Sequence, residues 1–230
     1  MTQTSKARSL EQIKCEMIVL KGGEITLHDE KTKRQWSVSL KPFAIAKFAV
    51  TEQLYSLFNP TQAITDQKNP VTQVTWYEAI RFCNFLSELA GLQTCYTFHS
   101  EEIECNWENN GYRLPSEAEW EHACRAGTTE VSYGELDSIA WHKENSGNRV
   151  HTVGLKIPND WGLYDTIGNV WEWCWDLFDS EVYGPYRVFR GGGWFDSPRG
   201  CRASCRHKSH PTFEIDDLGF RLARSLPINN

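Results

Sequence analysis

The chain contains 230 residues, a length that fits one large domain or two small ones. Hydrophobic residues make up 40% of the chain and charged residues 23%, a composition that is typical of globular proteins and excludes disordered and collagen-like chains. The formal net charge of −6 argues against general nucleic-acid binding.

No stretch of the sequence is suited to cross a membrane. The apolar run Phe43–Val50 is short and carries Lys47, whereas a membrane helix needs roughly 20 apolar residues. The first residues, Met1–Ser9, are polar and no apolar stretch follows them, so no secretory signal is apparent and a cytoplasmic location is predicted. The eight cysteines are then expected to be thiols rather than disulfides.

The first part of the chain predicts short strands and one short helix. Cys15–Thr26 and Gln35–Leu40 have strand composition, and a glycine-containing turn interrupts the first of them. Phe43–Val50 predicts a further strand, after which Thr51 is suited to cap a short helix that extends to Phe58. The polar segment that follows predicts a loop.

Two longer helices are marked by capping boxes, in which an N-cap hydroxyl and a glutamate three residues later satisfy each other's free amides. Thr75 and Glu78 open the first helix, apolar residues follow at helical spacing, and Gly91 ends it. Ser116 and Glu119 open the second helix, which a glycine also ends.

The second half of the chain contains no convincing long helix, because short strand candidates alternate there with turns rich in Gly, Asn, Asp and Pro. The spacing of Trp171, Trp173 and Trp175 places three rings on one face of a strand, where core packing is expected. No repeat or linker divides the chain. The sequence therefore predicts a single α+β domain over residues 1–230, with two main helices, small antiparallel sheets and many loops.

A series of motifs extends over nearly the whole chain: Phe48–Thr51, Pro70–Asn84, Tyr112–Glu121, Ala126-Gly127, Pro158–Asp165, Gly168–Trp173, Arg190–Trp194 and Gly219–Leu222. In this order they resemble the formylglycine-generating enzyme (sulfatase-modifying factor) family, and together they are highly specific. The resemblance implies the family's variant of the C-type lectin fold, in agreement with the predicted elements. Within these motifs, Arg113 lies next to the second capped helix and is suited to hold a carboxylate in the core.

The resemblance also implies a calcium site. It assigns the side chains of Asp165 and Glu172 and the backbone oxygens of Gly168 and Val170 as ligands. Two carboxylates that flank a turn with free carbonyl groups can hold such a hard cation. The alternative is that Glu172 pairs with an arginine while Asn169 braces the turn.

Enzymes of the family oxidise a substrate cysteine to formylglycine with oxygen, and they hold Cu(I) with two thiols five residues apart. In this sequence the second thiol corresponds to Cys201, but the first corresponds to Asp196, and the family's nearby serine corresponds to Gly193. Because Cu(I) prefers sulfur, an aspartate is a poor substitute. The departure argues against oxidase activity unless Cys205 supplies the missing thiol.

Cys201 and Cys205 are followed by His207 and His210, a set with the composition of zinc ligands. Structural zinc sites usually place a spacer between their Cys and His halves, and ten residues that hold all four ligands would form a very tight loop. Ordinary thiols and surface histidines are therefore the favoured interpretation.

The same segment supports a different function. Some non-enzymatic relatives on this fold are the variable proteins of diversity-generating retroelements, in which a fixed frame surrounds randomised positions. Residues 187–222 resemble such a segment, with Arg190–Trp194 and Leu218–Arg221 in the frame. The candidate variable positions, which are expected to form a ligand-binding surface, are Phe195, Asp196, Ser197, Gly200, Cys205, His207, Lys208, Ser209, His210, Thr212, Phe213, Ile215, Asp216 and Asp217.

The composition of these candidate positions supports that interpretation. Randomising the adenines of an asparagine codon cannot produce Lys, Glu, Gln, Met or Trp, and Lys208 is the one such residue among them. Adaptable polar groups mixed with a few aromatic anchors are typical of binding surfaces. We expect a protein or a peptide as the ligand.

The charge of this region differs from that of the rest of the chain. Arg187–Ser225 contains eight cationic side chains against four carboxylates, a net charge of +4 that leaves −10 for the remainder. A basic patch could attract an acidic ligand. Internal pairing of these arginines with carbonyl and carboxylate oxygens is the favoured alternative.

Three functions stay open at this point. The preferred one is a non-catalytic ligand-binding protein with a variable C-terminal surface. The second is a copper-dependent oxidase that converts a sulfatase cysteine to formylglycine with Cys201 and Cys205. The third is an accessory or structural paralogue that is not diversified.

Overall fold

The computed structural model describes residue 13, residues 16–100 and residues 102–226. Its strands are β1 (Met17–Leu20), β2 (Gly23–His28), β3 (Gln35–Leu40), β4 (Phe43–Ala49), β5 (Tyr96–Phe98), β6 (Ile103–Cys105), β7 (Tyr112–Arg113), β8 (Trp171–Leu177), β9 (Arg187–Arg190), β10 (Arg206–Ser209) and β11 (Leu218–Ser225). Its helices are α2 (Glu52–Tyr55), α3 (Trp76–Leu89), α4 (Glu117–Arg125), α5 (Leu136–Ile139) and α6 (Ser180–Tyr183). No helix in this part of the chain has both the length and the apolar character needed to span a bilayer.

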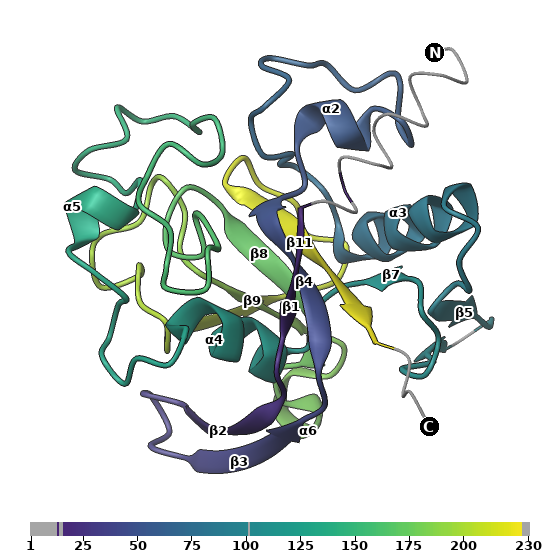
Figure 1. The fold of residues 1–230 in the computed structure, drawn as a ribbon, viewed down its shortest axis with the longest axis horizontal. Helices are drawn as coiled ribbons and strands as arrows, with labels where there is room; N and C mark the ends of the chain where they lie inside the picture. Colours follow the sequence, from purple (N-terminus) through teal and green to yellow (C-terminus); the bar gives the residue numbers. More distant parts are fainter. Residues whose placement is uncertain (1–12, 14–15, 101, 227–230) are drawn as a thin grey trace.

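The central sheet has the strand order β1-β4-β11-β8-β9-β10, and β7 pairs with β11 (Figure 1). The hairpins β2–β3 and β5–β6 form two separate small sheets. Antiparallel sheets were predicted, and the structure corrects this prediction at one pair, because β8 and β11 run parallel with Leu218 beside Trp171. The long connection between these strands makes the parallel pairing possible.

The N-terminal elements follow the prediction with shifted ends. The predicted strand Cys15–Thr26 is divided into β1 and β2 by a turn at Gly22, and Cys15 lies outside the described residues. A Cβ atom at Gly22 would lie 2.0 Å from the carbonyl oxygen of Leu40, so the turn requires glycine. Thr51 caps α2 as expected, but this helix ends at Tyr55 rather than at Phe58.

The two main helices begin at the predicted capping boxes. The hydroxyl of Thr75 accepts a hydrogen bond from Glu78 N at 3.2 Å, and the Glu78 carboxylate accepts one from Thr75 N at 2.9 Å. Ser116 and Glu119 form the same pair of bonds at the start of α4. Arg113 holds a carboxylate in the core as expected, and the structure identifies it as that of Glu119, whose two oxygens accept bonds from the guanidinium at 2.6 and 2.7 Å.

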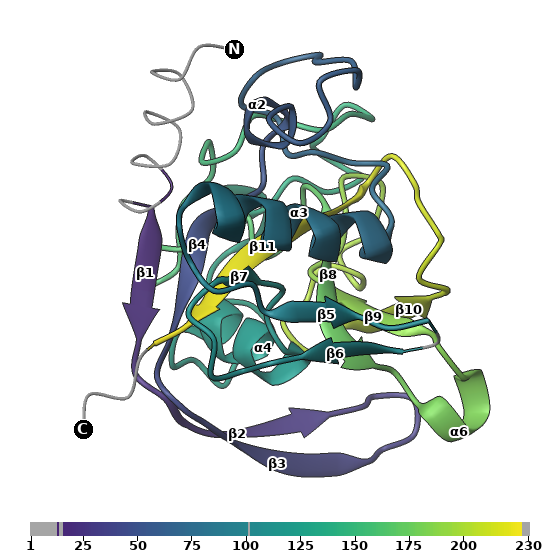
Figure 2. The same cartoon turned by 90° about the vertical axis from the view of Figure 1, so that its right-hand side faces the viewer.

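Helices α3 and α4 lie on opposite sides of the central sheet (Figures 1 and 2). The predicted tryptophan face of β8 packs on the α3 side, where Trp171 and Trp173 are buried and Trp175 is partly buried in one core cluster. The opposite face of β8 contributes Cys174 to a second cluster with Trp120 of α4. Beyond residue 128 the described helices are the single turns α5 and α6, so long loops carry the C-terminal site.

Candidate functional site

The frame of the segment 187–222 is buried while most candidate positions are exposed. Arg190, Leu218 and Arg221 are fully buried, and Cys201 has 1% of its surface exposed. The exposed candidates are Phe195, Ser197, His207, His210, Thr212, Phe213, Ile215 and Asp216. The partly exposed candidates are Asp196, Gly200, Cys205, Lys208 and Ser209.

Most arginines of this segment are engaged inside the protein, whereas Arg199 is exposed. Arg190 donates hydrogen bonds to the carboxylates of Glu117 and Glu121, and all three side chains are buried. Arg206 donates to Glu117 at 2.6 and 2.7 Å and to Asp29 at 2.9 Å. Internal pairing therefore accounts for most of the positive charge of the segment, as the favoured alternative predicted.

The indole of Trp171 connects two of the candidate positions. Its Nε1 donates a hydrogen bond to Asp196 Oδ2 at 2.7 Å, and its ring centroid lies 5.6 Å from that of His207. The backbone amide of Gly193 donates to the same aspartate oxygen at 2.8 Å. Trp171 is 6% exposed, so it forms the floor beneath these two side chains.

Trp194 connects two further candidates. Its Nε1 donates to the carbonyl oxygen of Asp216 at 3.3 Å, and its ring lies 5.6 Å from the ring of Phe195. The ammonium group of Lys143 lies 5.1 Å from the Phe195 centroid. We call the surface formed by Trp171, Trp194, Phe195, Asp196, His207, Asp216 and Asp217 the aspartate face.

Lys208 departs from the predicted single surface. Alternation along β10 turns it away from His207, and its ammonium lies 4.3 Å from the ring centroid of Phe178 and 4.0 Å from that of Tyr183. There it lines a separate hollow of about 420 Å³ that also includes Trp36. The candidate positions thus contribute to more than one surface.

Asp217 is the buried exception among the candidates, with 8% of its surface exposed. A Cβ atom at Gly193 would lie 2.5 Å from its Oδ2, so the carboxylate lies against a glycine backbone. Its own backbone amide donates a hydrogen bond to this carboxylate. Burial, followed by the charges of Asp196 and Asp216, raises the pKa of Asp217 to about 6.

Cys201 and Cys205 are poorly suited to hold the Cu(I) that the oxidase alternative requires. Burial raises the pKa of the Cys201 thiol to about 12, and the pKa of Cys205 is also raised by burial. Protonated thiols are poor ligands for Cu(I), and the carboxylate at position 196 is already hydrogen-bonded to Trp171. Within residues 13, 16–100 and 102–226, no three His, Cys, Asp or Glu side chains are grouped to hold a metal ion.

Glu172, one of the predicted calcium ligands, has both carboxylate oxygens occupied by hydrogen bonds from the protein. Both oxygens of Glu172 accept hydrogen bonds from Arg221, and Trp120 donates to one of them at 2.7 Å. The side chain of Asn169 bonds to the backbone of His151 and braces the turn. This is the alternative stated above, and Glu172 does not fit as a calcium ligand.

Asp165 is the remaining carboxylate of the predicted calcium site. Its Oδ2 accepts a hydrogen bond from Gly154 N at 2.7 Å, whereas its buried Oδ1 has no partner among the described residues. Burial raises the pKa of Asp165 to about 6. A carboxyl with a raised pKa and one free oxygen does not on its own make a calcium site.

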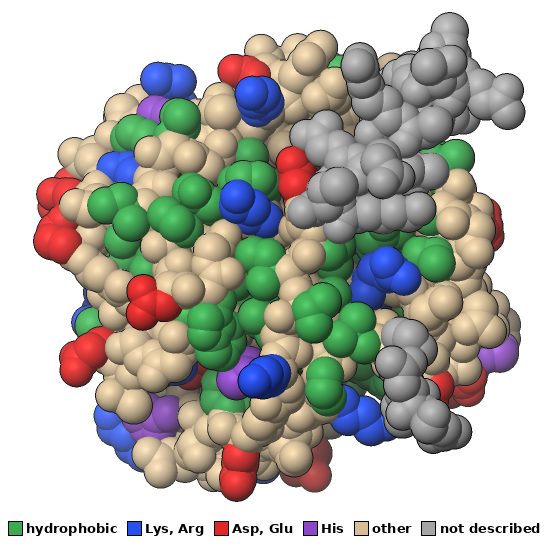
Figure 3. All heavy atoms as spheres, in the orientation of Figure 1, with side chains coloured by type: hydrophobic (Ala, Val, Ile, Leu, Met, Phe, Trp, Pro, Cys, Tyr) green, Lys and Arg blue, Asp and Glu red, His purple; other side chains and the backbone are tan. Residues whose placement is uncertain are grey.

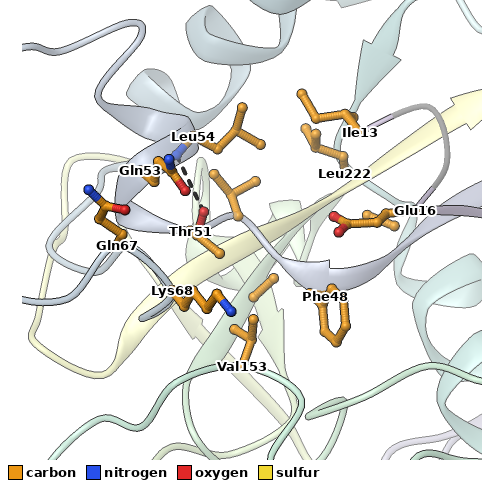
Figure 4. Close-up of a pocket in the computed structure, with 13 residues that line it drawn as sticks. Ile13, Glu16, Phe48, Thr51, Gln53, Leu54, Gln67, Lys68, Val153 and Leu222 are labelled. Atoms are coloured by element: carbon orange, nitrogen blue, oxygen red, sulfur yellow. Dashed lines mark hydrogen bonds between the residues drawn. The ribbon is translucent and has the colours of Figure 1, made fainter. Parts of the chain in front are cut away.

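A cavity of about 230 Å³ lies elsewhere, near the start of α2 (Figure 4). It borders Thr51, whose hydroxyl accepts a hydrogen bond from Leu54 N at 3.3 Å. Phe48, Val153 and Leu222 also line this cavity, and no predicted site residue does. On the molecular face seen in Figure 3, apolar side chains gather in the middle, over β1 and β4.

The sequence did not indicate two residues of the aspartate face, Trp171 and Trp194, nor the neighbouring Gly193, whose amide binds Asp196. The sequence favours the core for Trp171 and the frame for Trp194, and Gly193 stands at the position of a family serine. The signal available in the sequence was that Gly193 and Trp194 directly precede the candidate Phe195. Trp171 is brought beside the C-terminal segment by the β8–β11 pairing, in which it lies opposite Leu218, and the sequence did not predict this pairing.

A family model described as the sulfatase-modifying factor enzyme 1-like domain matches residues 3–226. The chaperone protein LppX of Paenibacillus barcinonensis is 28% identical over 91% of this chain and 89% of its own length. The formylglycine-generating enzyme of Streptomyces coelicolor is 32% identical over 52% of this chain and 49% of the enzyme, so the chain spans about half of that relative.

The fold is similar to that of a solved bacterial protein. Treponema denticola variable protein 1 aligns with 91% of this chain and 95% of its own chain, with a TM-score of 0.80 and 32% sequence identity. This similarity confirms the predicted α+β, C-type lectin-like fold. The chain belongs to the sulfatase-modifying factor enzyme 1-like family.

Proposed function

We propose that this protein is a non-catalytic ligand-binding protein that contacts a protein or peptide with the exposed candidate positions of residues 187–222. The observation that carries the proposal is the separation of the segment into a buried frame and exposed positions. Phe195, Phe213 and Ile215 are 56%, 38% and 43% exposed, respectively. Large apolar side chains on such a surface are available as anchors for a partner.

The oxidase alternative has weaker support from the same segment. It requires two accessible thiolates, whereas the thiol of Cys201 is buried and has a raised pKa. Incubating the protein with copper and a cysteine-containing sulfatase peptide tests this alternative directly. Mass spectrometry that detects conversion of the peptide cysteine to an aldehyde would overturn the non-catalytic proposal.

Selection from a displayed random peptide library tests the binding surface. The variant carrying Phe195→Ala, Phe213→Ala and Ile215→Ala removes the three exposed anchors and is expected to lose most binding to the selected peptides. A matched control removes three exposed apolar side chains from other loops and helices: Leu155→Ala, Ile157→Ala and Val182→Ala. Peptides that bind the wild type, the anchor variant and the control variant equally well would place the interaction elsewhere and contradict the proposal.

Diversification of the surface is a separate part of the proposal. It predicts a reverse transcriptase gene near the coding region and an imperfect repeat of the segment that encodes Arg187–Arg221. If both are absent from the genome, the paralogue without diversification becomes the better description. The peptide-binding experiment above would still decide whether that paralogue binds a ligand.

A further inference from the structure

β10 forms the C-terminal border of the central sheet. The strand order ends with β10, which pairs with β9 on its inner side (Figure 2). The backbone of Tyr186, the residue before β9, faces β8, because its carbonyl oxygen accepts a hydrogen bond from Phe178 N at 2.9 Å. Backbone groups alternate in direction along an antiparallel strand, so those of the next residue, Arg187, face β10 and meet Ser209.

The backbone of β10 therefore has an inner and an outer side. The groups of His207 and Ser209 face β9, whereas the amide and carbonyl groups of Arg206 and Lys208 face outward. No hydrogen bond joins these outward groups to another residue within the described part of the chain. Unpaired backbone groups at the edge of a sheet are a template for a further strand.

The charged side chains of β10 do not protect this edge in the usual way, because both are held to one side of the sheet. Arg206 donates to Glu117 and Asp29, and its Cζ lies 4.4 Å from the ring centroid of Phe178. The ammonium group of Lys208 lies 4.3 Å from the centroid of the same ring. Both side chains therefore lie over the hollow beside β10 rather than in front of its edge.

This hollow of about 420 Å³ is large enough to receive a side chain of an added strand. Its aromatic walls are Trp36, Phe178 and Tyr183. Side chains on one side of an added strand would point into the hollow, and those on the other side would point towards His207. The edge thus combines backbone groups that can hold a strand with a pocket that can distinguish its side chains.

The carboxylates at the hollow are engaged, whereas several of its cations are not. Glu117 and Asp29 bind Arg206. Asp179 and Asp176 each accept a bond from a backbone amide, and burial raises the pKa of Asp176 to about 7, which reduces its negative charge near neutral pH. The cations that line the hollow without an ion pair to another described residue are Lys31, Arg34 and Lys208. An acidic side chain complements this arrangement.

We infer that the edge of β10 binds an extended segment of a partner protein as an additional strand, with an acidic side chain of that segment directed into the hollow towards Lys208. This inference rests on the proposed function and specifies the form of the ligand. Backbone bonds to Arg206 and Lys208 provide affinity, and the hollow provides selectivity. Lys208 is also the candidate that randomised asparagine codons cannot encode, in keeping with a contact that is common to different ligands.

The test uses the full chain and a capped peptide, threonine-valine-glutamate-valine-threonine, whose β-branched residues favour an extended form. Amide hydrogen exchange is measured by NMR with and without the peptide. In the free protein the amides of Arg206 and Lys208 should exchange faster than those of His207 and Ser209. Saturating peptide should slow the two outward amides at least about tenfold. Unchanged exchange of these two amides overturns the inference.

Two changes to the peptide separate strand addition from simple attraction of charges. Neighbouring amides of a strand point in opposite directions, so methylating the backbone nitrogen of the glutamate and methylating that of the next valine should differ in effect. One should abolish binding and the other should be tolerated. Replacing the glutamate by lysine should weaken binding about tenfold. Equal effects of the two methylations contradict an added strand.

Reversing the charge of the hollow tests the side-chain contact. Lys208→Glu should weaken binding of the glutamate peptide at least about tenfold and strengthen binding of the lysine peptide. Lys21→Glu makes the same change of charge at an exposed residue between β1 and β2 and should leave both affinities unchanged. If Lys208→Glu binds the two peptides as the wild type does, the acidic side chain is assigned to the wrong place.

The outcomes separate this inference from the proposed function. Library peptides that depend on Phe195, Phe213 and Ile215 but leave the exchange of the Arg206 and Lys208 amides unchanged overturn the added strand, while the proposed function stands. If no peptide depends on the three anchors and none protects the β10 amides, both proposals fail.

Discussion

The carboxylate of Glu172 and the guanidinium of Arg221 form a buried ion pair that joins β8 to β11, with an Nη2–Oε1 distance of 2.7 Å. Trp120 of α4 donates to the same carboxylate at 2.7 Å, and Arg221 also donates to the carbonyl oxygen of Ala46 in β4 at 2.9 Å. One pair of side chains therefore connects three strands and a helix beneath the C-terminal segment.

Breaking this pair is expected to destabilise the fold strongly. Glu172→Gln leaves the buried Arg221 without a counter-charge and should lower the free energy of unfolding by about 3–5 kcal/mol, as measured by urea denaturation. Glu108→Gln is the control, because its ion pair with Lys41 lies at the surface and should contribute less than about 1 kcal/mol. Similar losses in the two variants would show that the buried pair has no special role.

Asp176 is expected to make stability depend on pH. Burial, and then the charge of Glu117, raises its pKa from 3.8 to about 7 in the folded protein. As the pH rises between these values, the unfolded chain loses the proton first, so the free energy of unfolding falls. The total fall is on the order of 2–4 kcal/mol.

The variant Asp176→Asn isolates this contribution. Its amide oxygen can still accept the hydrogen bond that Glu117 N donates to the aspartate at 2.6 Å. The difference in unfolding free energy between variant and wild type should therefore grow in favour of the variant as the pH rises from 4 towards about 7. Denaturation curves at several pH values provide the measurement, and a constant difference would argue against a raised pKa.

Gly219 permits a close approach of two backbones. A Cβ atom at this position would lie 2.2 Å from the carbonyl oxygen of Val71, so Gly219→Ala forces β11 away from its neighbour. We expect a loss of about 1–3 kcal/mol of unfolding free energy. Gly23→Ala serves as the comparison, because its nearest contact is an ordinary 3.8 Å to the ring of His122. The prediction fails if the two alanine variants melt at the same temperature.

The described cysteines should differ in their reaction with iodoacetamide. Cys105 and Cys205 are partly exposed and are expected to react slowly in the native protein, since burial raises the pKa of both thiols. Cys201 and the other buried thiols should react only after denaturation. Peptide mapping by mass spectrometry identifies the labelled positions. Rapid labelling of Cys201 would instead reveal an accessible thiolate and revive the oxidase alternative.

Features set by neighbouring residues could be predicted from the sequence. The capping boxes at Thr75 and Ser116 involve partners three residues away, and the bond between Arg113 and Glu119 spans a single capped turn. The tryptophan face of β8 follows from strand alternation alone. Each of these predictions needed no knowledge of the overall topology.

Features that depend on distant pairings could not be predicted. The parallel contact of β8 with β11 and the network that joins Arg206 to Asp29 connect residues far apart in the chain. His207 and Lys208 point in opposite directions through alternation along β10, but the surfaces they face depend on the pairing of β10 with β9. The burial of Asp217 depends on its contact with Gly193, which no periodic pattern encodes.

The separation of buried frame from exposed positions has a consequence for evolution. Side chains such as Thr212, Phe213 and Ile215 belong to none of the core clusters of the described residues. Substitutions there should change the free energy of unfolding little, and several of them together should add up without cooperative loss. The ligand of this surface could therefore change through a few successive substitutions, and the protein would still fold after each of them.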